Sequence, residues 1–133
     1  KDKTKISKET FYKIINGDIN EIAMTNDKLY NEFIKDMRIK CLQPSVIVEY
    51  KRLALTYPIS DVRITFDSSV RSGRYNYDLF SENLETFSVL DPNQVILEVK
   101  FNDYLPESLA IILTTIPSFR QAVSKFALCR AIK

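Results

Sequence analysis

The sequence contains no histidine and no tryptophan, and it has only two glycines among 133 residues. Without histidine, the chain cannot form a Ser-His-Asp or Cys-His catalytic site or a zinc site with imidazole ligands. Gly17 and Gly73 are too few and too far apart to form a glycine-rich loop that cradles phosphates with backbone N–H groups. A phosphate would therefore be held by Arg and Lys side chains. A metal would be a hard cation such as Mg²⁺ or Mn²⁺ on carboxylates.

Cysteine, net charge and long apolar runs are also scarce. Cys41 and Cys129 have neither metal-ligand nor CxxC spacing, so we expect both to be reduced core residues, as is usual in the cytoplasm. No run approaches the ~20 apolar residues of a membrane span. The net charge is only +2, which argues against a nucleic-acid-binding surface and requires any basic patch to be local. The chain begins with neither Met nor a signal peptide, which suggests a start inside a longer protein.

Three runs in the middle of the chain predict strands, at residues 46–56, 61–67 and 94–102. In the second run, Val62 and Ile64 alternate with Arg63 and Thr65, and the third run shows the same period of two. One face of each strand is thus apolar and the other is polar or charged. Pro58 predicts a turn between the first two strands. Residues 68–83, rich in Ser, Asn and Tyr, predict a flexible loop.

Helical patterns flank these strands on both sides. The sequence predicts helices at residues 7–16, 27–41, 105–116 and 118–130, with a short helical turn at 19–23. We expect Ser7, Thr25 or Asn26, and Ser118 to act as N-caps, and Gly17 to end the first helix. The apolar stripes of the helices are expected to be buried, with Ile111 and Ile112 among them. Helices before and after a group of strands predict a single α+β domain with a largely antiparallel sheet.

Five charged residues are candidates for a binding site. They lie at alternating positions of the strands or near the C-terminal end of the chain, and they are Arg52, Arg63, Glu98, Lys100 and Lys125. One interpretation is that each simply faces water. The other is that the helices cover the apolar faces and the sheet curls into a barrel, so that the charged faces line a cavity. Four cations around one carboxylate would suit a polyanion with one divalent cation.

Four short motifs occur in a characteristic order along the chain. They are Tyr50-Lys51-Arg52, VRITFD at residues 62–67, ILEVKF at 96–101 with a following Leu-Pro, and SKF–LCR at 124–130. Their series resembles the VTC domain, which is the polyphosphate polymerase domain of the triphosphate tunnel metalloenzyme superfamily. The upstream KIS and FYKIINGDI runs, and Leu42-Gln43-Pro44 before the first strand, are similar to bacterial members.

The resemblance implies a closed antiparallel β-barrel, which forms a basic tunnel with helices packed outside. It also implies that the tunnel binds triphosphate or polyphosphate, and that polymerase members transfer the γ-phosphoryl group of ATP onto a growing chain. By the same resemblance, Arg52, Arg63, Lys100 and Lys125 would bind phosphate during catalysis. Tyr50 would add a hydroxyl contact, and Glu98 would be the ligand of Mn²⁺ or Mg²⁺.

The chain departs from the family pattern at its N-terminal side. The domain of that family begins with strands that carry an acidic-and-lysine signature, and no such segment is found here. We therefore expect residues 1–133 to be the C-terminal portion of the domain, with unpaired strand edges that lead to self-association or to pairing with an N-terminal half. Other functions remain open: a triphosphate hydrolase of the same fold, a non-catalytic polyphosphate or triphosphate sensor, and a plain α+β interaction domain.

Overall fold

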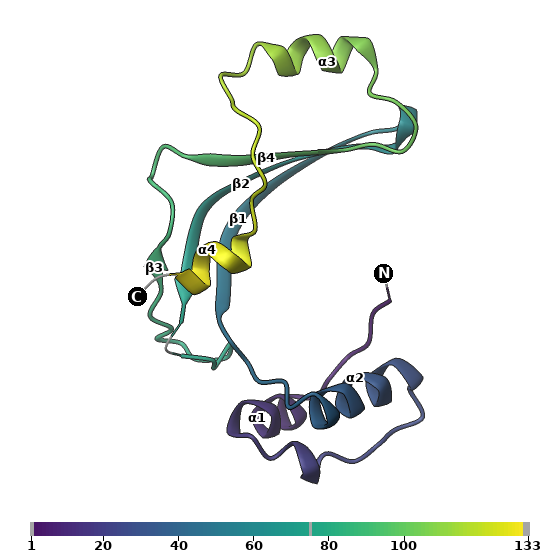
Figure 1. Cartoon of the computed structure of the whole chain (residues 1–133), viewed down its shortest axis with the longest axis vertical. Helices are drawn as coiled ribbons and strands as arrows, with labels where there is room; N and C mark the ends of the chain where they lie inside the picture. Colours follow the sequence, from purple (N-terminus) through teal and green to yellow (C-terminus); the bar gives the residue numbers. More distant parts are fainter. Residues whose placement is uncertain (1, 75, 132–133) are drawn as a thin grey trace.

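The computed structural model describes residues 2–74 and 76–131 and has the predicted α+β class (Figure 1). Its helices and strands, in chain order, are α1 (Lys8–Asn16), the 3₁₀ turn η1 (Ile19–Glu21), α2 (Lys28–Ile39), β1 (Ile47–Tyr57), the 3₁₀ turn η2 (Ile59–Asp61), β2 (Val62–Gly73), β3 (Phe87–Ser88), β4 (Val95–Lys100), α3 (Glu107–Thr114) and α4 (Lys125–Ala131). No helix in the described ranges is long and apolar enough to cross a membrane.

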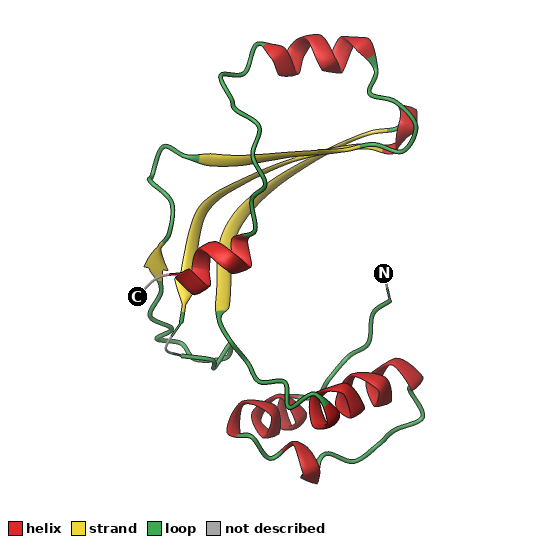
Figure 2. Cartoon of the chain, in the orientation of Figure 1, coloured by secondary structure: helices red, strands yellow, loops and turns green. Residues whose placement is uncertain are grey.

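The strands form an antiparallel sheet around β2. Strand β1 pairs along β2, while β4 pairs with the first half of β2 and β3 with its end. Among the described residues, β1 and β4 pair with β2 and with no other strand, so the sheet is curved but not closed (Figure 2). The antiparallel sheet is confirmed, and the barrel stays a prediction.

Strand β2 is longer than expected. Within residues 68–73, predicted to be part of a flexible loop, Ser68 and residues 71–73 pair with β1, and Arg71 and Ser72 also pair with β3. Ser69 adopts φ 51°, and the register shifts opposite it between Glu49 and Lys51. This bulge interrupts the alternation of side chains, which is why a pattern of period two ends at residue 67 although the strand continues. Tyr75, also in the predicted loop, lies outside the described residues.

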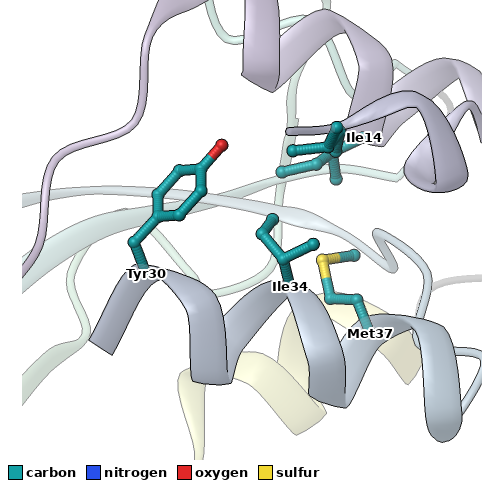
Figure 3. Close-up of a cluster of buried hydrophobic side chains, with 5 residues drawn as sticks. Ile14, Tyr30, Ile34 and Met37 are labelled. Atoms are coloured by element: carbon teal, nitrogen blue, oxygen red, sulfur yellow. The ribbon is translucent and has the colours of Figure 1, made fainter. Parts of the chain in front are cut away.

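Helices α1 and α2 pack against each other at one end of the molecule (Figure 1). Ser7 caps α1 by accepting a hydrogen bond from the N–H of Thr10 (3.0 Å), and Gly17 ends the helix at φ 87°. The N-cap of α2 is Asp27, which accepts from the N–H of Tyr30 (3.1 Å), so the prediction of Thr25 or Asn26 is wrong. The buried residues of this cluster are Ile14, Ile22, Tyr30, Ile34 and Met37 (Figure 3).

The C-terminal helices differ from the prediction. Helix α4 begins at Lys125, where the Oγ of Ser124 accepts a hydrogen bond from the N–H of Ala127 (3.2 Å). Ser118 therefore does not cap a helix, because residues 118–124 are not helical. Ile111 and Ile112 of α3 are 59% and 57% exposed, so their predicted burial is wrong.

The two cysteines have different environments, although both are free thiols. Cys129 on α4 is fully buried, as predicted for a core residue, whereas Cys41 is exposed, and its expected burial is wrong. Cys41 follows the end of α2 and has φ 50°, so the chain has already left the helical stripe that predicted its burial.

The apolar face of the sheet is exposed along β1 and at the start of β4. Leu53, Leu55 and Val95 on this face are between 50% and 59% exposed. The expectation that four helices cover it is wrong: α1 and α2 pack on each other, α3 lies away from the strands, and α4 contacts the opposite face through Asp67 (Figure 1).

Candidate functional site

The strand register places the predicted charged residues of the sheet on one face. Arg63 lies opposite Lys100, and Glu98 lies opposite Thr65. Directly paired residues of antiparallel strands share a face, and so do residues two positions apart on one strand. Arg52 of β1 joins the same face because it pairs with Asp67, which lies two positions beyond Thr65. We call the face that carries Arg52, Arg63, Asp67, Glu98 and Lys100 the cationic face.

Asp67 lies at the base of this face and connects it to α4. Its carboxylate is fully buried and accepts two hydrogen bonds from Arg52, one from Nε (2.6 Å) and one from Nη2 (2.7 Å). The Nζ of Lys125, the first residue of α4, lies 2.7 Å from the second carboxylate oxygen. Lys125 is thereby brought to the cationic face from a different element. Arg63 shares this face through its pairing with Lys100.

The charges around Asp67 stabilise its ionised form. The hydrogen bonds from Arg52, together with the one from Lys125, lower the pKa of Asp67 to about 2 against the opposing effect of burial. The same bonds raise the pKa of Arg52. Asp67 therefore remains a carboxylate at neutral pH, and it is an internal counterion for two cations at once.

Tyr50 contributes its ring to the cluster. The guanidinium carbon of Arg52 lies 5.0 Å from the ring centroid, and the Nζ of Lys125 lies 5.2 Å from it. Both distances are within the range of cation–π attraction, which helps to fix the two cations. The predicted hydroxyl contact of Tyr50 with phosphate stays a prediction.

Glu98 carries the second carboxylate of the cationic face. Its Oε1 lies 2.8 Å from the Nζ of Lys100, and both side chains are accessible, at 41% and 62% exposure. The hydrogen bond from Lys100 and the nearby charges of Lys125 and Arg52 lower the pKa of Glu98. The carboxylate is thus ionised and reachable, as a ligand for a hard cation must be.

Thr65 occupies the centre of the cationic face, directly across from Glu98. Its Oγ1 is buried and has no hydrogen-bond partner among the described residues. Buried hydroxyls are normally paired, because an unpaired one costs free energy. This orphaned hydroxyl marks a polar position beside Glu98 that a bound group with a hydrogen-bond donor or acceptor would satisfy.

The donor set limits how a metal could be held. No group of three or more Cys, Asp or Glu side chains suited to a metal occurs in the described part of the chain. The carboxylate of Asp67 is already occupied by Arg52 and Lys125. Glu98 remains as a single accessible carboxylate, which fits Mg²⁺ or Mn²⁺ only if phosphate oxygens and water complete the coordination, as they commonly do for Mg²⁺.

Asp67 and Thr65 were not among the predicted site residues. Both belong to the VRITFD motif and follow Arg63 at steps of two, so the alternation already places them on its face. A carboxylate at that position, facing cations on neighbouring strands, is the signal that could have identified Asp67. What the sequence could not show is that its partners come from both β1 and α4.

The fold and the cluster together define a class of protein: an α+β domain with a curved antiparallel sheet that gathers cations on one face. A family model, the VTC domain, matches residues 1–132. The chain therefore belongs to the VTC domain family. No curated protein and no solved structure gives a significant match.

The lowered pKa of Asp67 predicts a specific loss of stability in acid. The pKa is 3.8 without its partners and about 2 in the folded chain, so the unfolded state takes up the proton first. The stabilisation is complete above about pH 4 and is lost as the pH falls towards 2. We expect the melting temperature of the wild type to fall across this window by a few degrees more than that of Asp67→Asn, which cannot titrate.

Thermal melts at pH 7, 4, 3 and 2, followed by circular dichroism, measure this difference. Asp103→Asn, which removes an exposed carboxylate outside the cluster, serves as the matched control and should follow the wild type. If the melting temperatures of the wild type and Asp67→Asn fell equally with pH, the lowered pKa of Asp67 would be contradicted.

Proposed function

We propose that this VTC domain binds triphosphate or polyphosphate on its cationic face and transfers the γ-phosphoryl group of ATP onto a growing polyphosphate chain. The observation that supports the proposal is that Arg52, Arg63 and Lys100 share one face of the sheet with the accessible carboxylate of Glu98, and that Lys125 reaches this face from α4. With Asp67 included, four cations face two carboxylates, which leaves this cluster an excess of positive charge for a polyanion. Membership of the VTC family supports a polyphosphate-related function.

The chemistry of phosphoryl transfer suits this set of residues. The reaction depends mainly on positioning and on stabilising charge at the phosphate oxygens. The attacking group would be a terminal phosphate oxygen, which is already ionised at neutral pH, so the absence of histidine is no obstacle. Arg52 and Arg63 would hold phosphates through their planar donor groups, while Lys100 and Lys125 would add point charges. Mn²⁺ or Mg²⁺, when bound at Glu98, would supply further charge stabilisation.

The open sheet supports a further part of the proposal. The outer edges of β1 and β4 carry no strand among residues 2–74 and 76–131, and the apolar face of the sheet is exposed at Leu53, Leu55 and Val95. We propose that additional strands, from an N-terminal half of the domain or from a second copy, complete the tunnel, and that the domain works in the cytoplasm. Two alternatives use the same cationic face: a sensor that binds without turnover, and a triphosphate hydrolase.

One assay separates these functions. The full-length protein is incubated with ATP and Mn²⁺, and the phosphate products are resolved by chain length on a gel and by ³¹P NMR. A polymerase produces chains longer than triphosphate, whereas a hydrolase releases orthophosphate alone. Binding of tripolyphosphate in a calorimeter with no product would indicate a sensor. The absence of both binding and turnover would reject the proposal.

A further inference from the structure

The buried carboxylate of Asp67 has a geometry unlike that of the other charged groups on the cationic face. Its side chain is completely buried, whereas those of its two partners, Arg52 and Lys125, are 33% and 21% exposed. The anion therefore lies beneath the cations instead of beside them. A ligand arriving at the face meets the cations first, and Asp67 does not occupy the position that the ligand would take.

The hydrogen bonds to Asp67 leave donors available for a ligand. Arg52 has five N–H groups, and it uses one on Nε and one on Nη2 to bind the carboxylate side-on. Three N–H groups of the guanidinium remain in a plane that the carboxylate fixes. Lys125 likewise engages one oxygen of Asp67 and keeps two of its three N–H groups.

Asp67 also determines where α4 begins relative to the sheet. The contact with Lys125 holds the first turn of α4, and the hydroxyl of Ser72 donates to the carbonyl of Cys129 (2.7 Å) near its end. Asp67 lies on β2, Arg52 on β1 and Lys125 on α4, so a single carboxylate connects three elements. The positions of both cations depend on it.

We propose that Asp67 is a positioning residue that orients Arg52 and Lys125 for phosphate binding and fixes α4 at the site. This inference rests on the proposed function and adds to it a residue that contacts no phosphate. The inference makes a distinctive prediction. If Asp67 acted only by repelling the polyanion, removing its negative charge would strengthen binding. Positioning predicts the opposite sign: removal of the negative charge weakens binding, because the cations lose their fixed orientation.

Tripolyphosphate affinity is measured by calorimetry for the wild type and for Asp67→Asn in the full-length protein. We expect Asp67→Asn to bind at least about tenfold more weakly, the scale seen when supporting partners of a binding site are removed. The same substitution is then made in an Arg52→Ala/Lys125→Ala background. There it should cause no loss, because the residues through which Asp67 acts are gone. A purely structural role would weaken binding in both backgrounds.

A second variant covers the case in which Asp67→Asn does not fold, which circular dichroism would reveal. Arg52→Lys keeps the positive charge and leaves Asp67 paired, but an ammonium group cannot engage both carboxylate oxygens in a fixed plane. We expect Arg52→Lys to bind tripolyphosphate at least about fivefold more weakly, because its donor group is no longer held in a fixed orientation before the ligand binds. Unchanged affinity in Arg52→Lys would overturn the positioning role.

A ligand-free readout separates this inference from the proposed function. In ¹H–¹⁵N NMR spectra, the Nε–H of Arg52 should be protected from exchange in the wild type and unprotected in Asp67→Asn. Wild-type protein that binds no tripolyphosphate overturns the proposed function and the inference with it. Wild-type binding combined with equal or tighter binding by Asp67→Asn, or with equal losses in the two backgrounds, overturns the inference alone.

Discussion

Replacing Glu98 by Gln should abolish metal-dependent chain synthesis in the full-length protein while leaving the fold intact. The substitution keeps the size of the side chain and removes the accessible carboxylate of the cationic face. Mg²⁺ and Mn²⁺ bind a neutral amide oxygen more weakly than a carboxylate, so glutamine at this position should hold the ion too weakly for turnover. The lost partner, Lys100, is 62% exposed, so breaking this surface ion pair should change stability little.

Two measurements check this expectation. Chain length is followed on gels with ATP and Mn²⁺, and Mn²⁺ binding in the presence of tripolyphosphate is followed by electron paramagnetic resonance. Glu107→Gln, an exposed position at the start of α3, is the matched control and should behave as the wild type. Chain synthesis at the wild-type rate by Glu98→Gln would show that Glu98 is not the metal ligand.

Replacing Arg52 by Ala should lower the melting temperature by several degrees and also weaken tripolyphosphate binding. Asp67 is fully buried, and its two hydrogen bonds from Arg52 would be lost together. A buried carboxylate that keeps only one of its two cationic partners destabilises the folded state. Adding Asp67→Asn should recover part of the lost stability, because the amide needs no counterion.

Thermal unfolding of the two single variants and the double variant forms a cycle that measures the coupling. Lys28→Ala removes an exposed cation on α2, 90% accessible, and should leave the midpoint nearly unchanged. Additive losses in the double variant would mean that Arg52 and Asp67 stabilise the fold independently, contrary to the contacts in the structure.

Alternation along β2 explains how much of the site could be read from the sequence. Arg63 and Thr65 fall on one face by period two, and the antiparallel pairing then brings Glu98 and Lys100 onto the same face. The bulge at Ser69 could not be read in this way, because serine runs followed by a glycine are typical of loops. The second half of β2 was consequently predicted to be a loop.

The sequence pattern does not predict contacts between elements that are distant along the chain. Lys125 was selected by resemblance, but nothing in its local sequence indicates that it reaches a carboxylate 58 positions earlier in the chain. The prediction that helices cover the apolar face of the sheet is wrong for a related reason. Apolar stripes show that a helix needs a partner, but they do not say which surface it finds, and α1 and α2 bury theirs against each other.

The most direct test of the central claim, that the cationic face binds a phosphate chain, is a thermal melt with tripolyphosphate. A ligand that binds only the folded state adds roughly 2.7 kcal/mol of stability at about 100 times its dissociation constant. For a domain of this size, that corresponds to a rise of several degrees in the melting temperature. The reference is sodium chloride at matched ionic strength, and both series are run with and without Mn²⁺.

We predict that tripolyphosphate raises the midpoint by several degrees more than sodium chloride does, and that Arg63→Ala loses most of the difference. Arg63 is exposed on the cationic face, so its removal should affect binding more than folding. Equal midpoints in tripolyphosphate and sodium chloride would show that the cations are a solvated surface, and the account of this protein as a phosphate-chain-binding domain would be wrong.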